Sequence, residues 1–152
     1  MHKSIAIALL SFLGSSTIPL LAEENLTKSE LGFSVIVNSQ NTIGSLDRKF
    51  LADVYFKKIT RWPADGTILP IDLRADAPAR RKFSEFVLKR SVMATKSYWQ
   101  RLIFSGQDVP PPEFLSDEEV IQYVLKNPNA IGYVANTSLS PTLSGVKTIN
   151  IK

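Results

Sequence analysis

The pattern of hydrophobic and polar positions predicts short strands alternating with amphipathic helices. Residues 33–38 are apolar or β-branched and end at a polar run, which is typical of a buried strand. After Ser45, apolar residues recur at helical spacing and predict an amphipathic helix of about three turns. These residues are Leu46, Phe50, Leu51 and Val54.

The middle of the chain predicts one strand followed by two helices. Residues 68–74 form the predicted strand, in which Pro70 indicates an edge strand or a strand start. Asp76 is a candidate cap of the next helix, and Pro78 falls in its first turn, where a missing N–H does no harm. Another helix is expected over about 93–104.

The last third predicts a helix and two strands. Three prolines at 110–112 favour an extended segment. Residues 116–126 open with a capping box and predict a helix, and strands are expected at 130–135 and 146–151. The whole order predicts the α/β class, with a small mixed β-sheet flanked by helices.

A secretory signal is predicted at residues 1–22. Lys3 precedes an apolar stretch that small polar residues interrupt, and Ala22 offers a small residue at the expected cleavage point. An uncleaved anchor is the alternative. Residues 23–152 are then enough for a single domain. Since the chain has no cysteine, a lipoprotein anchor is excluded, and we expect a periplasmic protein.

The chemistry available to the mature chain favours binding over catalysis. His2 is the only histidine and lies inside the predicted signal, so histidine-based triads and histidine-ligated metal sites are excluded. We expect no metal, no cofactor and no enzyme activity. The formal net charge of +4 falls by one with the loss of Lys3, and acidic residues are interleaved with basic ones, so the charge pattern does not favour nucleic acid.

A cluster of charges at residues 71–83 is the main candidate site. Arg74 offers a guanidinium fork, and the helix start after Asp76 offers unpaired N–H groups, both suited to an oxyanion. Arg80 would add a further charge, and Asp76 could accept the proton of a monohydrogen oxyanion such as phosphate. The alternative is that Asp76 is only a helix cap and that residues 80–82 form an exposed helix face.

Other polar and aromatic residues are open to two interpretations. Ser39 and Gln40 follow the first strand and are candidate ligand donors, although turn-forming polarity explains them as well. Trp62 could line a pocket or a partner surface. For Trp99, at helical spacing, a place in the core is the more common outcome.

Four stretches resemble a known family in the same order. They are "VIVNSQNTIGSLDRKFLADVYFKKITRW", "ILPIDLRADAPARRKFSEFVL", "YWQRLIFSGQDVPPPEFLSDEEVIQYV" and "NAIGYV". From about Phe33 to Val134 the chain resembles the second lobe of the phosphate-binding proteins of ABC transporters, which are type II periplasmic binding proteins. It is closer still to short, single-lobe exported proteins that carry the family's name. The resemblance implies one binding-protein lobe, phosphate or a related oxyanion as ligand, and an ABC permease as partner.

The resemblance also shows departures. The family's strand-to-helix junction is Arg-x-Asp-Gly-Ser-Gly-Thr, whose first two contact residues match Arg74 and Asp76. Residues 77–80 replace the other four, which removes two hydroxyl donors, and Pro78 has no N–H. Lys57 likewise stands where the family has a glycine.

The family binds its ion between two lobes, and this chain has residues for one. The resemblance therefore implies that two copies form a homodimer around the ion, that another envelope protein supplies the second wall, or that the lobe is no longer a receptor. The alternative function is a periplasmic protein-interaction or signalling module, with the basic cluster as its docking face.

Overall fold

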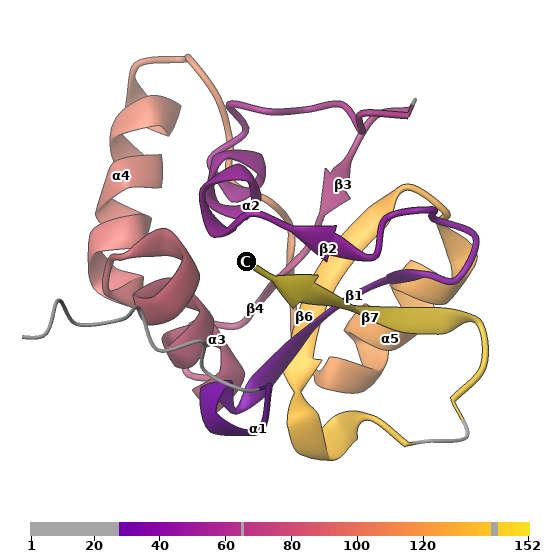
Figure 1. Cartoon of the computed structure of the whole chain (residues 1–152). Coiled ribbons are helices and arrows are strands. Elements are labelled where there is room, and N and C mark those ends of the chain that lie inside the picture. Colours follow the sequence, from indigo (N-terminus) through magenta and orange to yellow (C-terminus); the bar gives the residue numbers. More distant parts are fainter. Residues whose placement is uncertain (1–27, 65, 141–142) are drawn as a thin grey trace, which may run out of the picture.

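The computed structural model describes residues 28–64, 66–140 and 143–152 (Figure 1). The predicted signal and cleavage point lie outside these residues. The first elements are α1 (Lys28–Leu31), β1 (Phe33–Asn38), β2 (Ser45–Leu46), α2 (Arg48–Tyr55), β3 (Leu69–Pro70) and β4 (Asp72–Leu73). They are followed by α3 (Pro78–Phe83), the π-helical turn η1 (Ser84–Leu88), α4 (Val92–Phe104), β5 (Glu113–Phe114), α5 (Asp117–Lys126), β6 (Ala130–Ala135), the 3-10 turn η2 (Asn136–Ser138) and β7 (Val146–Ile151).

A five-stranded mixed sheet lies at the centre, in the order β2-β7-β1-β6-β3. Strand β1 is antiparallel to both β6 and β7, whereas β3 is parallel to β6 and β2 is parallel to β7. A separate two-stranded sheet pairs β4 with β5 in parallel. The predicted α/β class with a small mixed sheet is confirmed.

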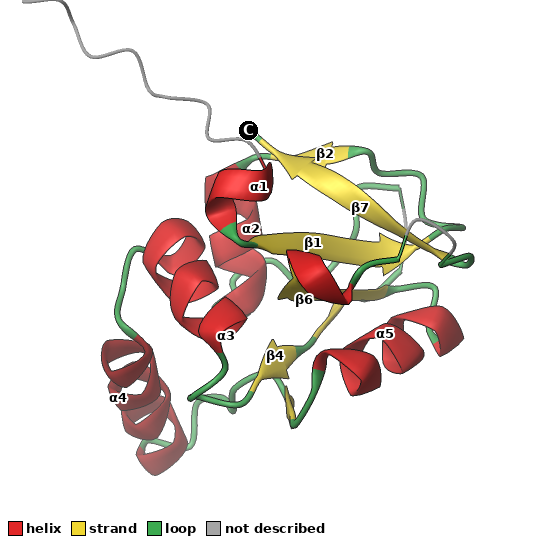
Figure 2. Cartoon of the chain, turned by 90° about the horizontal axis from the view of Figure 1, so that it is seen from below, coloured by secondary structure: helices red, strands yellow, loops and turns green. Residues whose placement is uncertain are grey.

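Helices cover both faces of the central sheet. A Cβ added at Gly132 would lie 2.6 Å from Val120 Cγ1 of α5, so this position of β6 faces α5. The next residue, Tyr133, stacks on Phe83 of α3 with ring centroids 3.9 Å apart. Because successive strand positions point to opposite faces, α3 and α5 lie on opposite sides of β6. Figures 1 and 2 show α2, α3 and α4 on one side of the strands and α5 on the other.

Several predicted elements are confirmed. Strands β1, β6 and β7 have the predicted bounds, and α4 begins one residue before the expected helix. Half of the predicted capping box forms at α5, where Ser116 Oγ accepts from the backbone N–H of Glu119 at 3.2 Å. The Glu119 carboxylate accepts from the N–H of Leu115 at 2.9 Å, one residue before the expected donor. Pro70 lies in β3, an edge strand of the sheet, as the missing N–H requires.

The helix predicted after Ser45 is shorter than expected. Asp47 is its N-cap, because its carboxylate accepts from the N–H groups of Lys49 and Phe50, and α2 has eight residues. Leu46 belongs to β2 instead, where it pairs with Ile151. Long-range strand pairing overrides the helical spacing at this position.

The strand predicted at residues 68–74 is divided into two. Its first part, β3, joins the central sheet beside β6, and its second part, β4, joins β5. Asp76 does not cap α3, so that prediction is wrong: Ala77 is the N-cap and makes no side-chain bond. The carboxylate of Asp76 is bound by Arg74 instead.

Lys57, at the position where the family that the sequence resembles has a glycine, adopts a positive φ of 55°. This left-handed conformation is strained for residues with a Cβ, which explains why glycine suits the position. The Lys57 ammonium lies 3.3 Å from Asp108 Oδ1. None of the helices in the described residues is long and apolar enough to cross a membrane.

Candidate functional site

Arg74 and Asp76 form an ion pair at the surface where β4 leads into α3. Nε and Nη2 of Arg74 donate to the two carboxylate oxygens of Asp76, at 2.5 and 2.6 Å. The Arg74 side chain is 52% exposed. Hydrogen bonding to Arg74 lowers the pKa of Asp76, so the carboxylate is ionised at neutral pH. Among the described residues Arg74 Nη1 has no hydrogen-bond partner, which leaves its two N–H groups for a ligand.

A surface hollow of about 440 Å³ lies beside this pair. It is lined by Ala75, Asp76, Arg81, Glu85, Ser91, Val92, Met93 and Lys96. The hollow lies between the start of α4 on one side and the end of α3 and η1 on the other. Two cationic and two acidic side chains therefore line it. An anion could approach Arg81 and Lys96 there only next to the carboxylates.

Arg80 lies inside the protein, away from the exposed pair. It is 2% exposed and forms a buried ion pair through Nη1 with Asp72 Oδ2. The Tyr133 hydroxyl donates to Asp72 Oδ1, which also accepts from the Leu73 N–H at 3.0 Å. The charge of Arg80 is therefore balanced by Asp72 within the core, and Arg80 supports the strand-to-helix junction from the interior of the protein.

The exposed helix face expected for residues 80–82 is found for two of them, and neither interpretation holds for Arg80. Arg81 and Lys82 lie on an exposed helix face. Arg80 belongs to neither an exposed face nor the surface hollow. Its Nε and the Oγ of Ser84 are buried polar atoms without a hydrogen-bond partner.

Burial in the same region raises the pKa of two tyrosines. Desolvation is the main cause for Tyr55 and for Tyr133, and the nearby Arg80 charge opposes it only partly. Tyr55 donates its hydroxyl to the Ile71 carbonyl at 3.0 Å. Both phenols therefore stay protonated and serve as hydrogen-bonding groups of the core.

Ser39 and Gln40 lie at the opposite end of the sheet from Arg74. The Ser39 N–H donates to the Gly145 carbonyl at 2.9 Å, and the Gln40 N–H donates to Asn38 Oδ1 at 2.9 Å. Ser39 and Gln40 follow the carboxyl end of β1, which lies beside the start of β6 because the two strands are antiparallel. Strand β3 runs parallel to β6 from that same end, and Arg74 comes after β3 and β4, so Arg74 lies toward the other end of β6. The length of a six-residue strand, about 16 Å, separates the two ends. One small ion cannot contact both groups.

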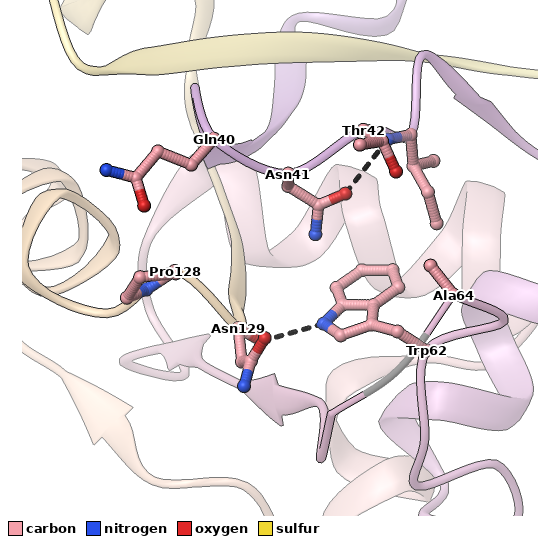
Figure 3. A pocket seen from close by; sticks show the side chains of 8 residues that line it. Gln40, Asn41, Thr42, Trp62, Ala64, Pro128 and Asn129 are labelled. Atoms are coloured by element: carbon pink, nitrogen blue, oxygen red, sulfur yellow. Dashed lines mark hydrogen bonds between the residues drawn. The ribbon is translucent and has the colours of Figure 1, made fainter.

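Gln40 lines a second cavity of about 280 Å³, which we call the amide pocket (Figure 3). Its lining residues are Gln40, Asn41, Thr42, Ile43, Trp62, Ala64, Pro128 and Asn129. Trp62 is 5% exposed, and its indole N–H donates to the Asn129 carbonyl at 3.1 Å. Trp62 therefore belongs to the hydrophobic core and also forms part of the wall of the pocket.

The part played by Asn129 was not predicted from sequence. In the sequence Asn129 follows Pro128 and has the pattern of an ordinary turn residue that ends a helix, so nothing local marks it as part of a pocket. Only the pairing of the strands brings it beside Trp62 and close to the turn after β1. Trp99 is 5% exposed, as expected for a core aromatic.

No protein-family model matches the sequence, and no curated protein sequence matches it significantly. Solved structures do match. An ABC-type phosphate transport receptor from Vibrio cholerae aligns with a TM-score of 0.59 and 22% identity, over 83% of this chain and 53% of the receptor. PstS from Borrelia burgdorferi aligns with a TM-score of 0.60 and 17% identity, over 84% of this chain and 55% of that protein.

These comparisons confirm the resemblance at the level of the fold. The chain spans about half the length of the proteins it matches, as one lobe would. The described residues therefore share the fold of about half of each of these solved proteins.

Proposed function

We propose that this protein is an exported, non-enzymatic solute-binding protein whose ligand is phosphate or a related small oxyanion. The observation that carries the proposal is the exposed Arg74 guanidinium, which is held by Asp76 and keeps N–H groups for a ligand. The fold shared with phosphate receptors supports it. The periplasm and an ABC permease, for uptake or sensing, are part of the same proposal.

Each residue of the junction has a distinct role in this proposal. Arg74 donates charge-assisted hydrogen bonds to the anion. Asp76 fixes the plane of the guanidinium and accepts the proton of monohydrogen phosphate, which sulfate lacks at neutral pH. Arg80 positions the junction by joining α3 to Asp72 of β4.

A second surface completes the site. Half of the Arg74 side chain faces water, where the solvent dielectric and salt weaken a single ionic contact. We propose that a second copy of this chain, or a partner protein of the envelope, covers the bound anion. Binding then becomes tighter because the ion is withdrawn from water.

A second candidate function is a periplasmic protein-interaction or signalling module. It is favoured by exposed apolar side chains on α4: Phe104 is 90% exposed and Met93 is 72% exposed. The two residues are eleven positions apart, about three helical turns, and so lie on one face of α4. Such a face suits contact with another protein.

Calorimetric titration with phosphate and sulfate tests the anion function. We expect phosphate to bind more tightly than sulfate and Arg74→Ala to weaken phosphate binding about ten- to hundredfold, because it removes charge-assisted hydrogen bonds. Arg61→Ala is the matched control, since it removes the same charge from an exposed position at the other end of the sheet. Absence of heat with both anions at millimolar concentration would exclude this function and leave the interaction module.

The second surface is tested by measuring the molecular mass in solution with and without phosphate. A dimer that forms or tightens with phosphate supports the two-copy site. A monomer under both conditions contradicts the two-copy site and leaves the partner protein as the second wall.

A further inference from the structure

The amide pocket has a chemistry different from that of the Arg74 junction. None of the described residues that line it is charged. Three of them, Gln40, Asn41 and Asn129, carry primary amides, each of which can donate and accept hydrogen bonds. A charged ligand would find no opposite charge in these side chains, whereas a neutral molecule with several hydroxyl groups matches them.

The amides retain free hydrogen-bonding capacity. Asn41 Oδ1 accepts from the Ile43 N–H at 2.9 Å, and this bond fixes the side chain while leaving its amide N–H groups available. Within the described part of the chain, the side chains of Gln40 and Asn129 make no hydrogen bond. Figure 3 shows the amides of Asn41 and Asn129 near the indole of Trp62.

The wall of the pocket is preorganised and partly apolar. The bond from Trp62 to the Asn129 carbonyl ties the loop after α2 to the start of β6, so the two sides of the pocket are connected. Ile43, Ala64 and Pro128 add apolar contacts. Such a surface suits the C–H groups of a sugar ring, while the amides suit its hydroxyls.

The size of the cavity limits the ligand. At about 280 Å³ it is just below the lower end of about 300 Å³ for sites of drug-sized molecules. A single sugar ring or a polyol fits this range, whereas a long oligosaccharide does not. From the chemistry and the size together, we infer that the amide pocket binds a small neutral molecule of the sugar or polyol class.

This site is separate from the proposed anion site. The amide pocket lies at the carboxyl end of β1, and Arg74 lies at the opposite end of the sheet, about one strand length away. The inference therefore does not depend on phosphate binding. If phosphate does not bind at Arg74, the amide pocket can still bind a neutral ligand, and the reverse is also true.

Nuclear magnetic resonance of the ¹⁵N-labelled protein tests the inference. The indole N–H of Trp62 and the side-chain amides of Gln40, Asn41 and Asn129 are the reporters. D-glucose, D-galactose and myo-inositol are titrated as neutral probes, and inorganic phosphate as the charged comparison. We expect saturable shifts of these reporters with at least one neutral probe in the millimolar range and unchanged reporters with phosphate.

Two variants make the test specific. Gln40→Ala should weaken binding of the active probe about five- to tenfold, because it removes one side-chain hydrogen bond from an exposed position. Gln100→Ala, at an exposed position of α4, is the matched control and should bind as the unchanged protein does. The inference is overturned if no neutral probe gives saturable shifts, if phosphate gives the same shifts, or if both variants bind equally.

Discussion

Replacing Arg80 tests how the core supports the strand-to-helix junction. Arg80 is 2% exposed and Asp72 is 4% exposed, and their ion pair joins α3 to β4. Arg80→Met keeps a long apolar side chain of similar reach and removes only the charge and its hydrogen bonds. The variant leaves the Asp72 carboxylate buried with hydrogen bonds from Tyr133 and Leu73 but without a counter-charge.

The expected loss is large compared with ordinary domain stability. Removing one partner of a buried ion pair costs about 3–5 kcal/mol in the free energy of unfolding. A domain of this size has a total of about 5–15 kcal/mol. The substitution should therefore remove about a fifth or more of the stability, even though Arg80 Nε makes no hydrogen bond in the native core.

A double variant separates the loss of charge balance from the loss of packing. Asp72→Asn combined with Arg80→Met removes both charges, and the Asn oxygen can still accept from Tyr133 and Leu73. We expect the double variant to lose only about 1–2 kcal/mol relative to the unchanged protein. It should then be more stable than Arg80→Met alone.

Urea unfolding followed by tryptophan fluorescence measures these differences, since Trp62 and Trp99 are both buried. The reasoning is refuted if Arg80→Met costs less than about 1 kcal/mol, or if the double variant is no more stable than the single variant. Either result would mean that the charge of Arg80 does not stabilise the buried Asp72 carboxylate as their ion pair implies.

Two further predictions concern packing and charge. Gly132→Ala should lower the free energy of unfolding by about 1–3 kcal/mol in urea, because the new Cβ would lie 2.6 Å from Val120 Cγ1. Gly44→Ala is the control: its new Cβ meets no atom within 4 Å, so the free energy of unfolding should change by less than about 0.5 kcal/mol. Equal losses would contradict the close contact. The pKa of Asp76 should lie below its ordinary value of 3.8 and return toward it in Arg74→Ala, as followed by carboxyl ¹³C resonances. The stabilisation by this pair is present above pH 3.8 and is lost as the pH falls through the lowered pKa, and an unchanged pKa in the variant would disprove the coupling.

Elements with a strong local pattern were predictable from the sequence. The bounds of β1, β6 and β7 follow from short runs rich in apolar and β-branched residues, and the start of α5 follows from Ser116 and Glu119, which lie three positions apart. These signals depend on neighbours within one or two turns or on the two-residue repeat of a strand. The confirmed fold class rests on them.

The candidate site was less predictable because its contacts are distant in sequence. The Tyr133 hydroxyl that binds Asp72 is 61 positions away along the chain. Charged residues are usually exposed, so no local signal placed Arg80 in the core. The place of Asp76 depended on the competition between a capping bond and the guanidinium of Arg74, which the ion pair decided.

The amino-acid sequence determined the order of strands and helices and the charge cluster after β4, because these depend on local periodicity and residue type. The tertiary structure alone decided which charged side chains are exposed to solvent and which residues line the same pocket. The antiparallel pairing of β1 with β6 places Gln40 near Asn129 and far from Arg74. Strand direction is a relation between distant segments, and no local pattern encodes it.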